Sequence, residues 1–344
     1  DLIHGNRMIK QRAKAVVMAA GSMEQPVVFR DNDLPGIMLG TAAQRLIRLY
    51  GVRPGRRAVV LCANGDGYGV ALDLIEAGVT VACVADLRDA PGADARMEEV
   101  RARGVPLRPG ATVREAVAGR DGTLSGALVA QVTGRGICAA PGERFECDLI
   151  AMSAGYMPTG ALACHAGGRM VYDDTCHTFR VADAPHGMTL AGSVAGVHDL
   201  DAVVADGRAA GARAAGGDGG PAREPDDAGL NHPWPIFSHA GGHDFVDFDE
   251  DLQVKDIRDA VAEGYDHIEL AKRFSTATMG PSQGRHSLLP TARLVAEATM
   301  GEVGATTARP PFAAETFGHL AGRAFEPVRR TAMHARHVEA GARM

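Results

Sequence analysis

The sequence predicts an α/β protein with two related sheet-containing units, followed by a small helical domain. Three observations lead to this prediction. Residues 58–86 read as strand, glycine-rich turn, helix and strand, and the apolar runs at residues 14–21 and 145–155 end in similar small residues. Residues 254–300 show helical periodicity instead. A chain of 344 residues is long enough for about two domains.

The composition excludes several classes of protein. The net charge is −6 with no basic stripe, so we expect no nucleic-acid partner. No run of 18 apolar residues occurs and the first residues do not form a targeting signal, which predicts no membrane partner and a cytoplasmic location. The six cysteines show neither a CxxC nor a zinc spacing. Cys62 and Cys83 are predicted to be buried structural thiols, with a redox pair or a metal site as the alternative.

The first fifty residues predict a strand, a turn and a helix. The apolar run at residues 14–21 ends in Ala20 and Gly21, as a strand entering a tight turn would. Residues 32–36 have turn chemistry. Thr41 is then a candidate N-cap for a helix over residues 42–50, and Pro54 with Gly55 marks a boundary before the next strand.

Residues 58–86 predict a Rossmann-type βαβ unit. An apolar strand, a glycine-rich turn, a helix over residues 70–77 and a second strand ending in Asp86 are the parts that a dinucleotide site uses. The glycines are misplaced, however. If Ala63 takes the first position, Tyr68 takes the third, where its ring would hold the helix away from the strand; a shifted register puts Val70 there. We therefore expect the fold but not a grip on a nucleotide through this loop.

Residues 123–155 complete the unit that begins with the βαβ pattern at residues 58–86, and they end with a strand that resembles the one at residues 14–21. Residues 123–137 predict hairpin strands around Gly126 and around residues 134–136. Residues 145–155 repeat the earlier pattern of an apolar strand ending in small residues. This internal echo predicts two related nucleotide-type subdomains.

The stretch at residues 189–207 is the best candidate for ligand binding. A strand ends before Gly192, which allows close approach of the backbone to a ligand, and an alanine-rich helix follows over residues 201–215. The unpaired N–H groups at the start of such a helix attract an anion. The sequence thus predicts a phosphate position at this turn.

The remaining residues predict a linker and the helical domain. Residues 216–229 are rich in Gly, Pro and Asp, without apolar periodicity. Helices are expected over residues 254–263, 268–274 and 291–300, and an extended connector over residues 308–312. Trp234, the single tryptophan, is expected to be a packing anchor, with a lid or docking residue as the alternative.

Several motifs together resemble the alpha subunit of heterotetrameric sarcosine oxidase: AAGSMEQPVVF, DNDLPGIMLG, LAGSVAGVHDLDAVVADG, TMGPSQGR and TTARPPF. The resemblance implies a two-dinucleotide-binding, glutathione-reductase-like fold with an inserted second Rossmann subdomain. The domains implied are an outer dinucleotide-binding domain (1–50 and 158–216), the inserted subdomain (51–157), a linker (217–230), a small helical domain (231–300) and a connector (301–344).

The resemblance also implies a division of labour between subunits. The alpha subunit of that family binds NAD, while FAD on the beta subunit oxidises sarcosine to glycine. FMN at the interface passes electrons to oxygen, and tetrahydrofolate accepts the one-carbon unit at a C-terminal domain of alpha. The expected partners are therefore the beta, gamma and delta subunits. Because neither a leading glycine-rich unit nor the folate domain is seen, we expect a fragment that alone is inactive.

Carried over residue by residue, the family's NAD contacts fall on six positions: Ala20, Gly21, Gly192, Ser193, His198 and Leu200. His198 has a surface role at a helix start as its alternative. We expect no catalytic residue and no metal ligand in the chain.

The helical domain resembles the small iron–sulphur domain of related amine and opine dehydrogenases. The four ligand positions fall on Asp247, Asp249, Ser282 and Ser287, and none is a thiolate, so no cluster is predicted. This favours sarcosine oxidase over the opine branch. The two aspartates are expected to be solvated turn acids.

The sequence is also compatible with three other functions: an NAD(P)H-dependent flavin or disulfide oxidoreductase, the alpha subunit of a related opine or amine dehydrogenase, and a scaffold that binds no nucleotide. The lack of a CxxC and the altered glycine loop argue against the first.

Overall fold

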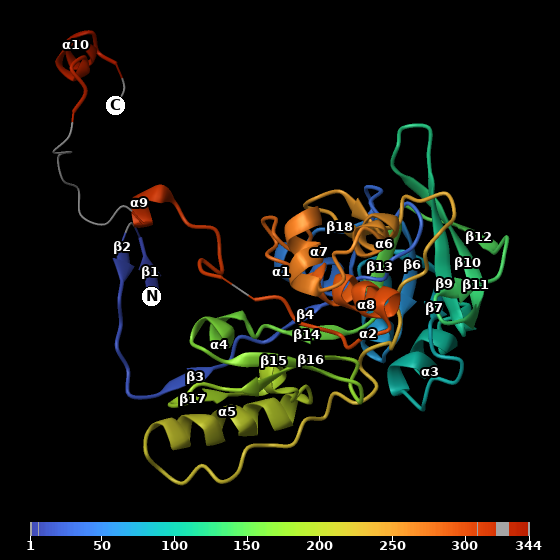
Figure 1. Ribbon diagram of the computed structural model, residues 1–344. Helices are drawn as coiled ribbons and strands as arrows, with labels where there is room; N and C mark the ends of the chain where they lie inside the picture. The colour runs from blue at the N-terminus through green and yellow to red at the C-terminus, as the bar shows by residue number, and fades with distance from the viewer. Residues whose placement is uncertain (1, 6, 308, 321–329, 343–344) are drawn as a thin grey trace. The chain divides into compact units, whose positions relative to one another are not determined.

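The computed structural model describes residues 2–5, 7–307, 309–320 and 330–342, and it divides into two compact units (Figure 1). The smaller unit comes from residues 1–14 and 313–344. Its described parts are the hairpin β1 (Leu2–His4) and β2 (Arg7–Ile9) with the short helices α9 (Phe317–Leu320) and α10 (His334–Glu339). The larger unit, residues 15–312, contains every candidate site residue.

A five-stranded parallel sheet is the centre of the inserted subdomain. Its order is β5 (Ile37–Leu39), β13 (Leu149–Ser153), β6 (Arg57–Cys62), β7 (Thr80–Asp86) and β8 (Leu107–Pro109). Alternate residues of β6 enter different cores, since side chains of a strand point to opposite faces. Val60 packs with the helices α1 (Gly40–Tyr50), α2 (Asp66–Glu76) and α3 (Ala95–Ala102), whereas Leu61 packs on the other face. The predicted βαβ unit is therefore confirmed.

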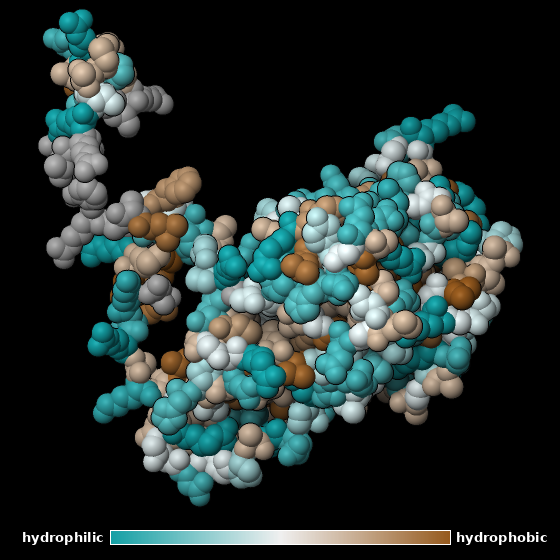
Figure 2. Space-filling model, viewed as in Figure 1, coloured by the Kyte–Doolittle hydropathy of each residue, from teal (hydrophilic) through white to brown (hydrophobic). Residues whose placement is uncertain are grey.

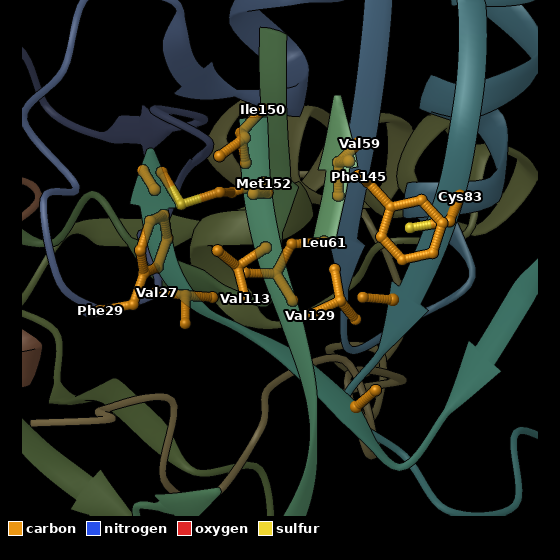
Figure 3. Close-up of a cluster of buried hydrophobic side chains, with 14 of the residues drawn as sticks. Val27, Phe29, Val59, Leu61, Cys83, Val113, Val129, Phe145, Ile150 and Met152 are labelled. Atoms are coloured by element: carbon orange, nitrogen blue, oxygen red, sulfur yellow. The ribbon is translucent and has the colours of Figure 1, made fainter. Parts of the chain in front are cut away.

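An antiparallel sheet covers that other face. It consists of β9 (Ala111–Ala118), β10 (Leu124–Gly134), β11 (Ile137–Cys138) and β12 (Glu143–Glu146). Figure 3 shows Val113, Val129 and Phe145 from this sheet gathered with Leu61 and Met152 of the parallel one. The hairpin turn at residues 135–136 is confirmed.

The turn expected around Gly126 is wrong, because this residue lies within β10 and pairs with Glu146. A Cβ here would come 2.9 Å from the Phe145 carbonyl oxygen, so the glycine serves close strand contact rather than chain reversal. β9 was not predicted from the sequence.

The outer part of the larger unit is built from three pairs of short strands and one long helix. β3 (Val16–Met18) and β17 (Met188–Leu190) are parallel, and α5 (Leu200–Ala214) packs beside them (Figure 1). β4 (Ser22–Glu24) pairs with β14 (Tyr156–Pro158), and β15 (Arg169–Asp173) with β16 (Thr178–Asp183). The short elements α4 (Ala161–His165) and the 3-10 turn η1 (Gly192–Ala195) complete it. The strand and helix predicted around residues 189–207 are confirmed.

The helical segment follows the linker, as predicted. It contains the hairpin β18 (Phe245–Asp247) and β19 (Leu252–Gln253) and the helices α6 (Val254–Ala262), α7 (Ile268–Ser275) and α8 (Leu288–Thr299). Trp234 is 5% exposed and packs in the same core as Ile257 and Leu294, which confirms its role as a packing anchor.

The start of α1 differs from the prediction. The helix begins at Gly40, and Thr41 lies within its first turn instead of capping it. The carboxylate of Glu24, from β4, accepts hydrogen bonds from the Thr41 N–H at 2.7 Å and from its hydroxyl at 2.6 Å. Glu24, which is distant in the sequence, therefore satisfies an N–H group at the start of α1 that a local N-cap would otherwise satisfy. Burial raises the pKa of Glu24.

The cysteines are unpaired, and the visible surface is mainly polar (Figure 2). All six thiols are free, Cys62 and Cys83 are fully buried as predicted, and burial raises the pKa of Cys83 to about 12. The visible face of the larger unit is mainly polar with scattered apolar residues (Figure 2). None of the helices in the described ranges is long and apolar enough to cross a bilayer.

Candidate functional site

Four of the six predicted contact positions meet at the carboxyl ends of β3 and β17. A Cβ added to Gly21 would lie 3.8 Å from the Ser193 hydroxyl oxygen, so the two turns touch. Gly21 and Gly192 have φ angles of +75° and +73°, a conformation that strains any residue with a side chain. Ala20 precedes Gly21 and is exposed. In α/β sheets, ligands bind in the crevice outside the carboxyl ends of the strands.

Asp206 is a buried residue of this site that the sequence reasoning missed. Its side chain belongs to α5, and its Oδ2 accepts a hydrogen bond of 2.8 Å from the Gly192 N–H. This hydrogen bond holds the left-handed turn at Gly192 against α5. It also satisfies the Asp206 carboxylate, which is buried and therefore needs a donor. The one available signal was an acid within an otherwise alanine-rich helix.

The start of α5 is not the open anion site that the sequence predicted. The Asp199 side chain accepts from the Ala202 N–H at 2.9 Å, and Asp226 accepts from the N–H groups of His198 and Asp199. These donors are therefore taken by the chain's own carboxylates, which also repel an incoming phosphate. Leu200, the first residue of the helix, is 75% exposed.

His198 packs toward the inserted subdomain. Its ring centroid lies 5.7 Å from that of Tyr156, whose hydroxyl donates a 2.9 Å hydrogen bond to Asp66 at the start of α2. Burial lowers the pKa of His198, so the ring is neutral at pH 7. The residue thus joins the two Rossmann-like parts instead of lying alone on the surface.

The glycine that brings α2 onto β6 is Gly67. A Cβ at this position would lie 2.1 Å from the Cys62 Cβ, so the helix rests directly on the strand. The expectation that Tyr68 holds the helix away is wrong. Its ring is 1% exposed and lies in the core between α2 and β7, with the hydroxyl bonded to Asp86.

Asp86 occupies the position that bonds a ribose in a working dinucleotide unit. Here its Oδ2 accepts from the Tyr68 hydroxyl and from Arg88 Nη2, both at 2.7 Å. Its Oδ1 accepts from the Arg88 N–H and Nε. The carboxylate is 2% exposed, and burial with this hydrogen bond raises the pKa of Tyr68. This geometry agrees with an inserted subdomain that does not grip a nucleotide by its own loop.

The Tyr68 hydroxyl is expected to stabilise the fold. Tyr68→Phe should lower the free energy of unfolding by roughly 1–3 kcal/mol, because a buried carboxylate loses a donor that water cannot replace. Tyr50→Phe is the matched control, since Tyr50 is 65% exposed, and it should change stability by less than about 0.5 kcal/mol. Urea unfolding measures both. Equal stability of the two variants would mean that Arg88 alone satisfies Asp86.

A cavity of about 240 Å³ lies beyond Gly21. The link is direct, because the N–H of Thr159, a lining residue, donates to the Gly21 carbonyl at 3.0 Å. The lining includes sulphur-bearing and charged side chains: Met23, Met157, Cys164, Met170, Glu269, Lys272 and Arg309. Three buried polar atoms of the lining have no hydrogen-bond partner: Thr159 Oγ1, His165 Nε2 and Thr278 Oγ1. The lining comes from residues 23 to 312, too far apart for the sequence to predict it.

The acidic pair of the helical segment has a structural role. Asp247 is 1% exposed, and it accepts hydrogen bonds from the Thr278 N–H at 2.7 Å and the Asp249 N–H at 3.0 Å. The prediction of a solvated turn acid is therefore wrong for Asp247. Asp249 is exposed, and its Oδ2 accepts from the Ser282 N–H at 2.7 Å. The hydroxyl of Ser287 is buried without a partner. In the described part of the chain, no three His, Cys, Asp or Glu residues form a metal site.

Comparison with known proteins agrees with the sequence resemblance. Residues 241–323 match the sarcosine oxidase A3 domain. The chain is 35% identical to the sarcosine oxidase subunit alpha of Rhizobium meliloti (strain 1021) over 94% of its length, and 34% identical to that of Corynebacterium sp. (strain P-1) over 96%. It spans about a third of the length of these relatives, 33% and 36%. The recognition from sequence motifs is thus confirmed for the region that the chain covers.

A solved structure shows the same fold. L-proline dehydrogenase from P. horikoshii superimposes with a TM-score of 0.69 at 18% sequence identity, over 92% of this chain and 60% of that one. The two-dinucleotide-binding α/β fold predicted from the sequence is confirmed.

Proposed function

We propose that this chain is the NAD-binding part of a multisubunit flavoprotein oxidase of the sarcosine oxidase type. The observation that carries the proposal is the pair of left-handed glycines, Gly21 and Gly192, at the carboxyl ends of two adjacent parallel strands. Backbone without side chains can approach a ligand closely there. The similarity to sarcosine oxidase alpha subunits over nearly the whole chain supports NAD among the dinucleotides that this fold binds.

The residues at this edge fit the neutral parts of a dinucleotide. The Ser193 hydroxyl makes no hydrogen bond to the described residues and can serve a ribose hydroxyl, while Ala20 and Gly21 leave room beside it. The diphosphate needs other donors, because Asp199 and Asp226 occupy the start of α5. The cavity beyond Gly21 would receive the part of the nucleotide that extends past the strand ends. His198 and Leu200 would be more distant contacts.

The amine chemistry is assigned to other parts of the assembly. In this proposal FAD on a beta subunit oxidises sarcosine to glycine, and FMN at the interface with that subunit passes electrons to oxygen. Tetrahydrofolate accepts the one-carbon unit at a further domain, and gamma and delta subunits complete the oligomer. The chain itself contributes binding and assembly, with no catalytic residue, no metal and no iron–sulphur cluster.

The test is the nucleotide content of the complete subunit purified with its partners. The wild-type complex should release NAD on denaturation, as measured by chromatography with mass spectrometry. Ser193→Leu should reduce the NAD content at least tenfold, because the larger side chain fills the crevice. Gly211→Ala, on the open face of α5, is the matched control and should retain NAD.

Three results would contradict the proposal. They are a wild-type complex without NAD, NAD content that Ser193→Leu leaves unchanged, and sarcosine oxidation by this chain with added FAD alone. NADPH consumption by the chain with an artificial acceptor would favour the reductase alternative instead.

A further inference from the structure

A second cavity lies away from the strand ends that form the candidate NAD site. Its volume is about 850 Å³, and it is bounded by the turn between β10 and β11, the turn between β15 and β16, residues 232–234 and the last turns of α8. Arg293, from α8, and Arg135, from the β10–β11 turn, both line it. The proposed function uses none of these residues.

Arg293 is a buried cation without a counter-charge. The residue is 3% exposed, and among the described residues no carboxylate lies within 4.0 Å of its guanidinium. Its Nη2 donates to neutral oxygens, the carbonyls of His177 at 2.6 Å and His232 at 3.2 Å, and to the Tyr172 hydroxyl at 3.4 Å. Within the described part of the chain, Nε has no partner and Nη1 makes no hydrogen bond. A buried charge without compensation destabilises the fold, and an arginine cannot avoid this cost by losing its proton.

The surroundings determine which anion would compensate this charge. His177 and His232 line the cavity, and burial lowers the pKa of both, to about 4 for His232, so they add no charge at neutral pH. Arg135 stacks over the Trp234 ring at 4.0 Å, and Tyr172 lies below Arg293.

Three acids also line the cavity. Glu297 is paired with Arg258 at 3.0 Å, whereas Asp89 and Asp174 make no ion pair within the described residues. These two carboxylates disfavour a doubly charged ligand such as phosphate, because like charges repel. One deep cation over the Tyr172 ring, in a cavity that Trp234 also lines, therefore favours a single negative charge on a planar group.

We propose that this cavity is a binding site for a small aromatic monocarboxylate, whose carboxylate pairs with the free edge of Arg293. A guanidinium holds a carboxylate by charge-assisted hydrogen bonds, and the ring of the ligand lies beside Tyr172 and Trp234. Arg135 strengthens binding from the rim. The site is independent of NAD binding at Gly21 and Gly192.

The probe is benzoate, titrated into the 344-residue chain by calorimetry, with Trp234 fluorescence as a second signal. Benzamide has the same shape without the charge, and inorganic phosphate tests the choice of anion. Benzoate should bind at least tenfold more tightly than either. Arg293→Met should weaken benzoate binding at least tenfold, and Arg135→Ala, at an exposed position, by roughly threefold.

Four results would overturn the proposal: no benzoate binding up to about 10 mM, equal binding of benzamide, tighter binding of phosphate, or benzoate binding that Arg293→Met leaves unchanged. Arg293 also bonds two carbonyls, so the test includes the case in which Arg293→Met does not fold. In that case two other measurements decide. If Arg293 has a purely structural role, benzoate and benzamide should bind equally well, and Arg135→Ala should not change the affinity for benzoate.

Discussion

Gly67→Ala is expected to lower the free energy of unfolding by about 3 kcal/mol, the upper end of the range for overpacked cores. The added Cβ would lie 2.1 Å from the Cys62 Cβ and 3.0 Å from its sulphur. Both carbons are attached directly to backbone, so no side-chain rotation relieves the clash and α2 must move off β6. Urea unfolding followed by circular dichroism measures the loss.

Gly69→Ala, in the same helix, is the control and should have the opposite sign. Its Cβ would meet only the flexible end of Arg96, at 3.5 Å. Alanine is favoured over glycine inside a helix by roughly 0.5–1 kcal/mol, so this variant should be slightly more stable than the wild type. A Gly67→Ala protein as stable as the Gly69→Ala protein would show that α2 does not rest on β6 as described.

Asp247→Ala is expected to destabilise the helical segment by roughly 2–4 kcal/mol. The substitution leaves the N–H groups of Thr278 and Asp249 without their acceptor, and the first of these bonds is buried. Trp234 packs in the core of this segment and is the single tryptophan, so its fluorescence reports unfolding there. Asp247→Asn keeps one acceptor oxygen and should lose about half as much.

Asp249→Ala provides the matched control for Asp247→Ala. Asp249 is exposed and accepts one hydrogen bond, from the Ser282 N–H, so its loss should cost less than about 1 kcal/mol. Similar losses at the two positions would contradict the buried role of Asp247.

The sequence predicted the elements well where their periodicity is local. The βαβ unit at residues 58–86, the strand and helix around Gly192 and the three helices of the C-terminal segment are all present. The register of the glycine turn was misjudged because α2 begins at Asp66, four residues before the predicted start, which makes Gly67 the contact point. Whether Tyr68 points into the core or against the strand depends on that start.

The failures at the site concern groups that are far apart in the sequence. Asp226 satisfies the start of α5 from 27 and 28 residues away, and Glu24 caps α1 from 17 residues away. Asp247 finds its partner 31 residues further on. No periodicity or spacing rule encodes such pairings, because they depend on how the elements pack.

The contact between Gly67 and Cys62 also makes the Cys62 thiol a probe of local opening in the inserted subdomain. The thiol lies fully buried beneath the helix, and burial raises its pKa well above the ordinary value. An alkylating reagent reaches this sulphur only when α2 separates from the strand. The labelling rate of Cys62 therefore reports the frequency of this local opening. This rate measures how firmly α2 is held on β6 without requiring the whole subdomain to unfold.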